Sequence, residues 1–249
     1  MVDVHSCDDV ASELNSKADG VVAIATQADT TSWEQQLAAY EAGKKEFGRV
    51  DYFFANAGIA EKRWIPHFEP STAAERPITK PNTLTLDINL DGQLNTAALA
   101  LQVFERQTPN RHGFRGKLVI TSSTYGHFPS AALPMYATSK AGVLHFTRSM
   151  AMMYAGTGIT VNAVCPGMTA TNIVSPQFLQ AFPEEHLCPI EFVVEQFMSV
   201  LGDNPDTGRA ISTHGREVWD QPLNTYKYET CRPSVEAVDA GFKRPSESA

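Results

Sequence analysis

Short runs of branched and aromatic residues alternate with longer helical segments along most of this 249-residue chain. Runs of this length and composition are typical of buried strands, and the segments between them are long enough for crossover helices. Strands are expected at residues 21–25, 50–55, 117–121, 159–164 and 207–219, and helices at residues 31–47, 83–106, 135–155 and 190–201. This alternation predicts an α/β fold with a doubly wound parallel sheet that helices cover on both faces.

Length and local signals predict one domain followed by a tail. At 249 residues the chain is long enough for one α/β domain and short for two. We expect the domain at residues 1–219 and a polar, partly disordered tail at residues 220–249. Four prolines predict an irregular surface loop at residues 60–82. Ser32 and Gly48 are expected to begin and end the helix between them.

Composition argues against several classes of partner. Charged residues make up 19% of the chain, the net charge is -8 and the basic residues are scattered. That balance argues against nucleic acid or an anionic membrane as the main partner. No apolar run approaches the ~18–20 residues that cross a bilayer, and residues 1–9 do not form a secretory signal. Four widely spaced cysteines match no zinc pattern, so we expect reduced thiols, no metal site and a cytoplasmic protein.

The two long helices, expected at residues 83–106 and 135–155, carry apolar side chains on more than one face. A helix with a single buried face would show a narrower stripe. Either each helix is sandwiched within the monomer, or one of its faces meets another subunit. The sequence leaves both alternatives open; the second predicts a homo-oligomer formed through these helices, which is our expectation.

Tyr136, Lys140 and Ser123 form a pattern suited to proton transfer at an alcohol or ketone oxygen. Tyr136 and Lys140 are four residues apart on an expected helix, so they lie on one face, one turn apart. A nearby ammonium favours the phenolate and is expected to lower the pKa of the phenol from its ordinary value of about 10. The phenol could then act as a general acid or base, while the Ser123 hydroxyl holds the same oxygen in place.

Tyr136 and Lys140 taken alone would fit a surface tyrosine beside a surface lysine. Their context favours chemistry, because Ser123 follows one strand and Pro166-Gly167 follows the next. His127 lies four residues after Ser123, which raises the possibility of a hydrolase. The Gly-x-Ser-x-Gly turn that exposes a hydrolase serine is missing from the sequence, so we set that class aside.

The order of these motifs resembles the short-chain dehydrogenase/reductase family over roughly residues 1–219. Ala55-Asn56-Ala57-Gly58 is similar to the family's Asn-Asn-Ala-Gly, with Ala in place of the first Asn. Asn89, Ser123, Tyr136 and Lys140 match the family's catalytic tetrad. The positions that resemble its cofactor-binding residues are Asp3, Asp29, Asn56, Ala57, Gly58, Tyr136, Lys140, Pro166, Gly167, Thr169 and Thr171.

The resemblance implies a Rossmann-like sheet and hydride transfer between NAD or NADP and a secondary alcohol or ketone of a small, largely apolar molecule. Tyr136 would be the acid/base, and Lys140 would lower its pKa and bind the nicotinamide ribose. Ser123 would orient the substrate oxygen, and Asn89 would position a water that links Lys140 to solvent. Asp3 would bind the adenosine ribose hydroxyls and repel a 2′-phosphate, which favours NAD.

One part of the family pattern has no counterpart in this sequence. Members of the family open with a strand and a glycine-rich turn whose helix holds the pyrophosphate, whereas Gly20 is the only glycine in the first forty residues here. The first strand and that turn, about 35–40 residues, are therefore expected to be missing. Either the chain is a shortened dehydrogenase that binds dinucleotide weakly, or it performs a cofactor-independent step (isomerisation, dehydration or cyclisation) or serves as a non-catalytic partner subunit. The intact tetrad favours the first interpretation.

Overall fold

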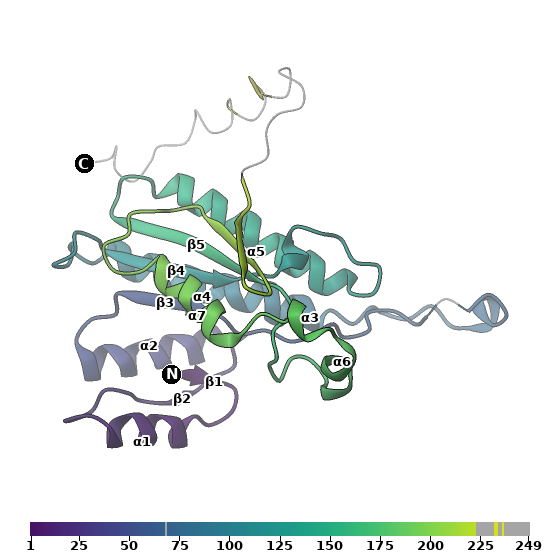
Figure 1. Ribbon diagram of the computed structural model, residues 1–249, viewed down its shortest axis with the longest axis horizontal. Coiled ribbons are helices and arrows are strands. Elements are labelled where there is room, and N and C mark those ends of the chain that lie inside the picture. Colours follow the sequence, from purple (N-terminus) through teal and green to yellow (C-terminus); the bar gives the residue numbers. More distant parts are fainter. Residues whose placement is uncertain (68, 223–231, 234–235, 237–249) are drawn as a thin grey trace.

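The computed structural model describes residues 1–67, 69–222, 232–233 and 236, and its main body is a sheet of five strands (Figure 1). The strands follow the order β3-β4-β5-β6-β7, with bounds Tyr52–Ala55, Gly116–Thr121, Ile159–Pro166, Ala210–His214 and Glu217–Asp220. The first four are parallel, and β7 is antiparallel to β6. The expected α/β fold with a parallel sheet is confirmed.

Helices cover both faces of this sheet. The longer ones are α2 (Trp33–Phe47), α4 (Gln93–Glu105), α5 (Pro134–Met153) and α7 (Ile190–Ser199), whereas α1 (Asp8–Ser16) lies beside the small sheet near the start of the chain (Figure 1). Alternate residues of β4 show the two faces. Leu118 and Ile120 belong to the core cluster that holds α4 and α5, whereas Val119 packs in the cluster that holds α7. This alternation is what the two-residue period of a strand requires when both faces are buried.

Two strands near the start of the chain form a separate parallel sheet. β1 (Val2–Asp3) pairs with β2 (Thr26–Gln27), and among the described residues neither strand is hydrogen-bonded to β3. The strand expected at residues 21–25 is wrong, because pairing begins only at Thr26. The Asn15 side chain instead binds the backbone of Val22 and Ala23 through three hydrogen bonds. These contacts satisfy backbone groups that would otherwise need a neighbouring strand.

The segment 207–219 contains two strands where the sequence predicted one. Gly215 has φ 56°, a left-handed conformation that reverses the chain between β6 and β7. The strand β7 includes Asp220, so the domain boundary expected at residue 219 falls inside a strand. The tail expected after it lies largely outside the described residues.

The proline-rich loop at residues 60–82 projects from the body of the molecule, as Figure 1 shows. It contains one short 3-10 turn, Ala73–Glu75. Its two limbs meet near the base, where the Asn82 N–H donates to the Trp64 carbonyl at 2.9 Å. The irregular surface loop expected here is confirmed.

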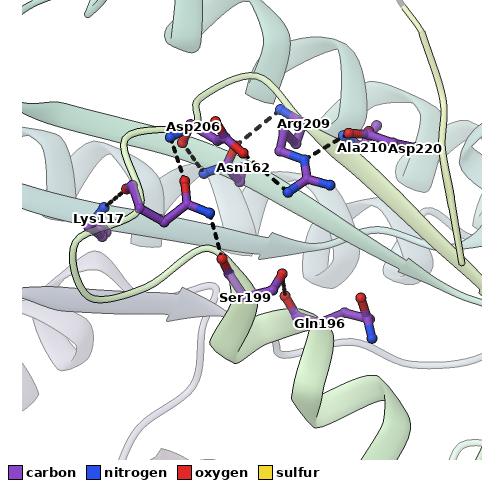
Figure 2. Close-up of polar contacts among 9 residues, drawn as sticks. Lys117, Asn162, Gln196, Ser199, Asp206, Arg209, Ala210 and Asp220 are labelled. Carbon is purple, nitrogen blue, oxygen red and sulfur yellow. Dashed lines mark hydrogen bonds and ion pairs between the residues drawn. The ribbon is translucent and has the colours of Figure 1, made fainter.

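Polar side chains tie the connection between α7 and β6 to the neighbouring strands (Figure 2). Asn162 of β5 donates to the Asp206 carbonyl at 2.8 Å and accepts from the Arg209 N–H at 3.0 Å. The buried Lys117 ammonium donates to the Asn204 carbonyl. Buried polar groups of this kind must be hydrogen-bonded, and here they are used structurally near the amino ends of the strands. The carboxyl ends carry the candidate site.

Candidate active site

A cavity of about 800 Å³ lies where β3, β4 and β5 end. Three short segments that follow these strands contribute to it, beginning at Asn56, Ser122 and Gly167. Ligand sites of open parallel sheets lie at the carboxyl ends of the strands, because the loops there are free to vary. The predicted site residues that line the cavity are Asn56, Gly58, Ser123, Tyr136, Lys140, Pro166, Gly167, Thr169 and Thr171.

Tyr136 and Lys140 lie one turn apart on α5 and share one environment. The Lys140 Nζ lies 5.7 Å from the centroid of the Tyr136 ring. It donates a hydrogen bond of 2.8 Å to the Thr121 carbonyl at the end of β4. The structure therefore brings together the phenol and ammonium that the sequence placed on one helix face.

Ser123 joins the same group from the other side of the cavity. It follows β4, where its hydroxyl accepts from the Tyr125 N–H at 3.3 Å and donates to the Pro166 carbonyl at 3.4 Å. A hydrogen bond between its side chain and Tyr136 lowers the pKa of that phenol, and the single hydroxyl proton serves either the phenol oxygen or the Pro166 carbonyl. The three side chains can thus surround one substrate oxygen.

The charge states differ from the sequence-based expectation. Burial raises the pKa of Tyr136, a change that the Ser123 hydrogen bond partly opposes and that Tyr125 reinforces. Burial also lowers the pKa of Lys140 to about 8, so this ammonium is itself costly to keep charged. The expected lowering of the Tyr136 pKa by Lys140 is wrong for the protein alone: burial raises this pKa, and the group that opposes the change is Ser123 and not Lys140.

Asn89 is fully buried and holds the turn that follows β3. Its side chain accepts from the Ile59 N–H at 2.7 Å and donates to the Ile59 carbonyl at 2.9 Å. A Cβ added to Gly58 would lie 3.3 Å from Asn89 Oδ1 and 3.5 Å from Lys140 Nζ, so the glycine lets these groups approach. Asn89 belongs to a π-helical turn, Asp87–Gly92, inside the segment that the sequence predicted as one uninterrupted helix.

The two acidic residues expected near the adenosine lie outside the cavity. Asp3 ends β1, where its carboxylate accepts from the His5 N–H at 2.9 Å. The Asp29 carboxylate follows β2 and accepts from the Thr31 N–H and hydroxyl, both at 2.8 Å. Both side chains are exposed, and neither lines the cavity. They are placed together at the carboxyl ends of the small sheet.

Two functional candidates were missed by sequence reasoning. Gln93 donates to the Ala57 carbonyl at 3.0 Å and to the Thr121 carbonyl at 3.2 Å, so it holds the turn after β3 against the end of β4. Glu61 lines the cavity and accepts a hydrogen bond from the Tyr136 backbone. Neither residue stands in a spacing pattern that could have identified it.

The cavity residues fit the nicotinamide half of a dinucleotide. The Lys140 ammonium and the Tyr136 hydroxyl can donate to ribose hydroxyls, and Thr169 and Thr171 offer further polar groups on the same wall. No helix among the described residues combines the length and apolar character needed to cross a bilayer. The same part of the chain holds no group of three or more His, Cys, Asp or Glu side chains that could bind a metal ion.

Comparison with known proteins gives consistent matches. The family model described as short chain dehydrogenase matches residues 2–181. The chain is 33% identical over 221 residues to the short-chain dehydrogenase/reductase prx7 of Penicillium rubens, covering 86% of this chain and 74% of that protein. It is 32% identical over 198 residues to prx4 of the same organism, covering 77% of this chain and 55% of that protein. The chain thus spans about half the length of the second relative.

A solved structure shows the same fold. The crystal structure of 3-oxoacyl-[acyl-carrier protein] reductase from Brucella melitensis in complex with NAD matches with a TM-score of 0.71 at 21% sequence identity. The match covers 86% of this chain and 84% of that chain. At this level of identity the likeness shows the arrangement of strands and helices.

Proposed function

This chain belongs to the short-chain dehydrogenase/reductase family, and from that premise we propose that it transfers hydride between NAD(P) and a secondary alcohol or ketone of a small molecule. The observation that supports the proposal is the meeting of Tyr136, Lys140 and Ser123 in one cavity. A phenol, an ammonium and a hydroxyl around one point are the groups that proton transfer to a carbonyl oxygen requires.

The protein's own residues would handle the proton and the orientation of the substrate. NAD(P) would supply or accept the hydride at the carbinol carbon. In alcohol oxidation, Tyr136 would accept the hydroxyl proton while the C–H bond electrons leave as hydride; in reduction, it would return that proton. Ser123 would donate a hydrogen bond to the same oxygen, and Lys140 would bind the ribose beside Tyr136.

The raised pKa of Tyr136 suits the general-acid direction when the protein is alone. A neutral phenol holds the proton that a reduced carbonyl oxygen needs. In the oxidation direction the phenolate must form first, so we expect oxidation of the alcohol to become faster as the pH rises.

Apolar walls support an apolar substrate. Leu133, Met168, Ile173, Val174 and Val193 line the cavity beside the three polar groups. Pockets of this kind gain affinity from the apolar surface that they bury and orientation from a few polar groups. NAD is favoured over NADP as the cofactor because the exposed carboxylate of Asp3, at the end of β1, would repel a 2′-phosphate.

Replacement of Tyr136 by Phe tests the proposed function. Tyr136→Phe is expected to reduce turnover of a panel of apolar alcohols and ketones to less than a tenth, a loss of more than about 1.4 kcal/mol in transition-state stabilisation. Turnover is followed by nicotinamide absorbance. Tyr125→Phe removes a second phenol from the same cavity and is expected to retain more than half of the activity. Survival of more than a tenth of the activity in Tyr136→Phe would show that another group moves the proton.

The separation of the two sheets favours a second candidate function. Asp3 ends β1 and Asp29 follows β2, and among the described residues these two strands form no hydrogen bond with β3. A cofactor-independent step on the same tyrosine cavity, such as isomerisation, dehydration or cyclisation, would not need those carboxylates. Product formation without added NAD(P) would support this candidate, and so would its loss in Tyr136→Phe.

We also propose that the chain forms a homo-oligomer through the two long helices. Within the chain, the apolar side chains of α4 are largely buried, and Met152 of α5 is 52% exposed. Most apolar side chains of these two helices are therefore buried within the monomer. The few that stay exposed, such as Met152, support a contact with another subunit. Light scattering should give a mass that is a multiple of 27.2 kDa. A monomer would rule out the homo-oligomer, and assembly only with a homologous chain would indicate a partner subunit.

A further inference from the structure

The amino end of α5 lacks a cap from its own neighbourhood. The first N–H groups of any helix have no partner within the helix, and a nearby Ser, Thr, Asp or Asn side chain usually accepts from one of them. Here Leu133 stands at the cap position and Pro134 opens the helix, and no side chain at the cap position makes that bond. Tyr136 lies in this first turn, so its backbone position depends on how the free N–H groups are held.

Glu61 supplies the missing acceptor from a distant part of the chain. Its Oε2 accepts from the Tyr136 N–H at 2.7 Å, and its Oε1 lies 3.4 Å from the Met135 nitrogen. A carboxylate at this end of a helix is favoured by the partial positive charge of the exposed N–H groups. No ion pair of the described residues involves Glu61, so its carboxylate is directed to the helix.

The backbone on both sides of Glu61 is itself held in place. Two residues before it, Ile59 exchanges hydrogen bonds with the Asn89 side chain through both its N–H and its carbonyl. One residue after it, the Lys62 N–H donates to the buried Thr85 hydroxyl at 3.0 Å. The carboxylate therefore extends from a segment that is fixed on both sides. A group that sets the position of another residue must itself be held in this way.

We propose that Glu61 is a positioning residue for Tyr136. Its carboxylate joins the turn after β3 to the first turn of α5 and so keeps the phenol beside Ser123, on the wall of the same cavity. The proposal rests on the proposed function, because it gives Glu61 a role only through the acid/base residue. It also predicts an effect on the Tyr136 ring that does not depend on any substrate.

Fluorine NMR of protein labelled with 3-fluorotyrosine tests this proposal without turnover. The Tyr136 resonance is assigned by its loss in Tyr136→Phe and is followed against pH in wild type, Glu61→Ala and Glu61→Gln. Loss of the cap should let the ring move from Ser123, whose hydrogen bond favours the phenolate. We therefore expect a displaced resonance and a higher titration midpoint in Glu61→Ala, with partial recovery in Glu61→Gln, which keeps one oxygen acceptor. Glu75→Gln, on an exposed part of the same loop, is the matched control and should behave as wild type.

Steady-state kinetics provide the second readout. We expect kcat to fall at least tenfold in Glu61→Ala while KM for the cofactor changes less than twofold, because Lys140, the expected ribose contact, stays held by the Thr121 carbonyl. A Tyr136 resonance and titration in Glu61→Ala identical to those of Glu75→Gln would overturn the proposal. If Glu61→Ala does not fold, the same measurements are made on Glu61→Asp. This variant keeps the negative charge, but its side chain is one methylene shorter, so the carboxylate no longer reaches the Tyr136 N–H. A wild-type protein without redox activity would refute the proposed function and leave the fluorine result interpretable.

Discussion

Two lysine side chains are buried in the part of the chain that the structure describes, and burial opposes the charge of each. Lys140 is 3% exposed and burial lowers its pKa to about 8. Lys117 is 2% exposed; burial lowers its pKa too, and the attraction of Asp203 and Asp206 opposes that change. Lys117 also lies 4.7 Å from the centroid of the Phe114 ring. The charge of Lys117 is thus stabilised by two carboxylates and an aromatic ring, whereas the charge of Lys140 is stabilised chiefly by the Thr121 carbonyl.

The Lys140 shift predicts how stability depends on pH. Below pH 8 both states hold the proton, and the native state bears the cost of a buried charge. Between pH 8 and 10.5 the unfolded state binds more protons, so stability rises with pH through this window. The free energy of unfolding of wild type, minus that of Lys140→Met, should increase across it by up to about 3 kcal/mol. Urea titrations from pH 7 to 10.5 measure this difference.

Burial raises the pKa of Cys165 to about 12, which makes stability fall with rising pH and so opposes the effect of Lys140. Cys165 is present in both proteins, so its effect cancels when the free energy of unfolding of Lys140→Met is subtracted from that of wild type. The same comparison with Lys117→Met is the control for a buried lysine whose charge is compensated. A difference between wild type and Lys140→Met that stays constant with pH would contradict the assignment of a lowered pKa to Lys140.

At the scale of single elements, residue types predicted the ends of a helix where the contacts that form those ends join neighbouring residues. The Ser32 hydroxyl accepts from the Gln35 N–H at 3.3 Å and caps α2, and Gly48 ends that helix with φ 77°. Both positions were predicted from residue type alone. The π-helical turn at Asp87–Gly92 was not, because it lies where Asn89 binds the turn after β3, a contact between residues 30 positions apart.

Two glycines give opposite predictions at the element scale. A Cβ at Gly116, the first residue of β4, would lie 1.9 Å from the buried Phe104 ring. Gly116→Ala should therefore destabilise the protein by about 1–3 kcal/mol through overpacking. Gly43 is inside α2 and nothing lies within 4 Å of the added carbon. Gly43→Ala should stabilise the protein by about 0.5–1 kcal/mol through higher helix propensity. Thermal unfolding of both variants checks the signs, and a stabilising Gly116→Ala would contradict the packing described for β4.

The whole molecule places the nicotinamide-binding and adenosine-binding candidates on different sheets. Asn56, Gly58 and Lys140 line the cavity, whereas Asp3 and Asp29 lie at the small β1–β2 sheet, outside the cavity lining. A dinucleotide that gains contacts at one half and few at the other should bind weakly, because each half contributes to the total free energy.

We therefore predict that this chain binds NADH and NADPH with Kd above about 10 μM, which corresponds to less than about 7 kcal/mol of binding free energy. Titration followed by nicotinamide fluorescence measures it. Lys140→Met, which removes the expected ribose contact, should weaken the remaining binding further. Tight binding by the wild-type chain would show that the two sheets hold the dinucleotide jointly.

The sequence by itself determined the alternation of strands and helices, the caps of α2 and the grouping of Tyr136 with Lys140, because these follow from periodicities and contacts within a few residues. Only the tertiary structure decided the hairpin at Gly215, the contact of Glu61 with the amino end of α5 and the raised pKa of Tyr136. Each of these depends on burial or on partners far apart in the chain. Residue spacing carries no information about such contacts until the sheet has brought the segments together.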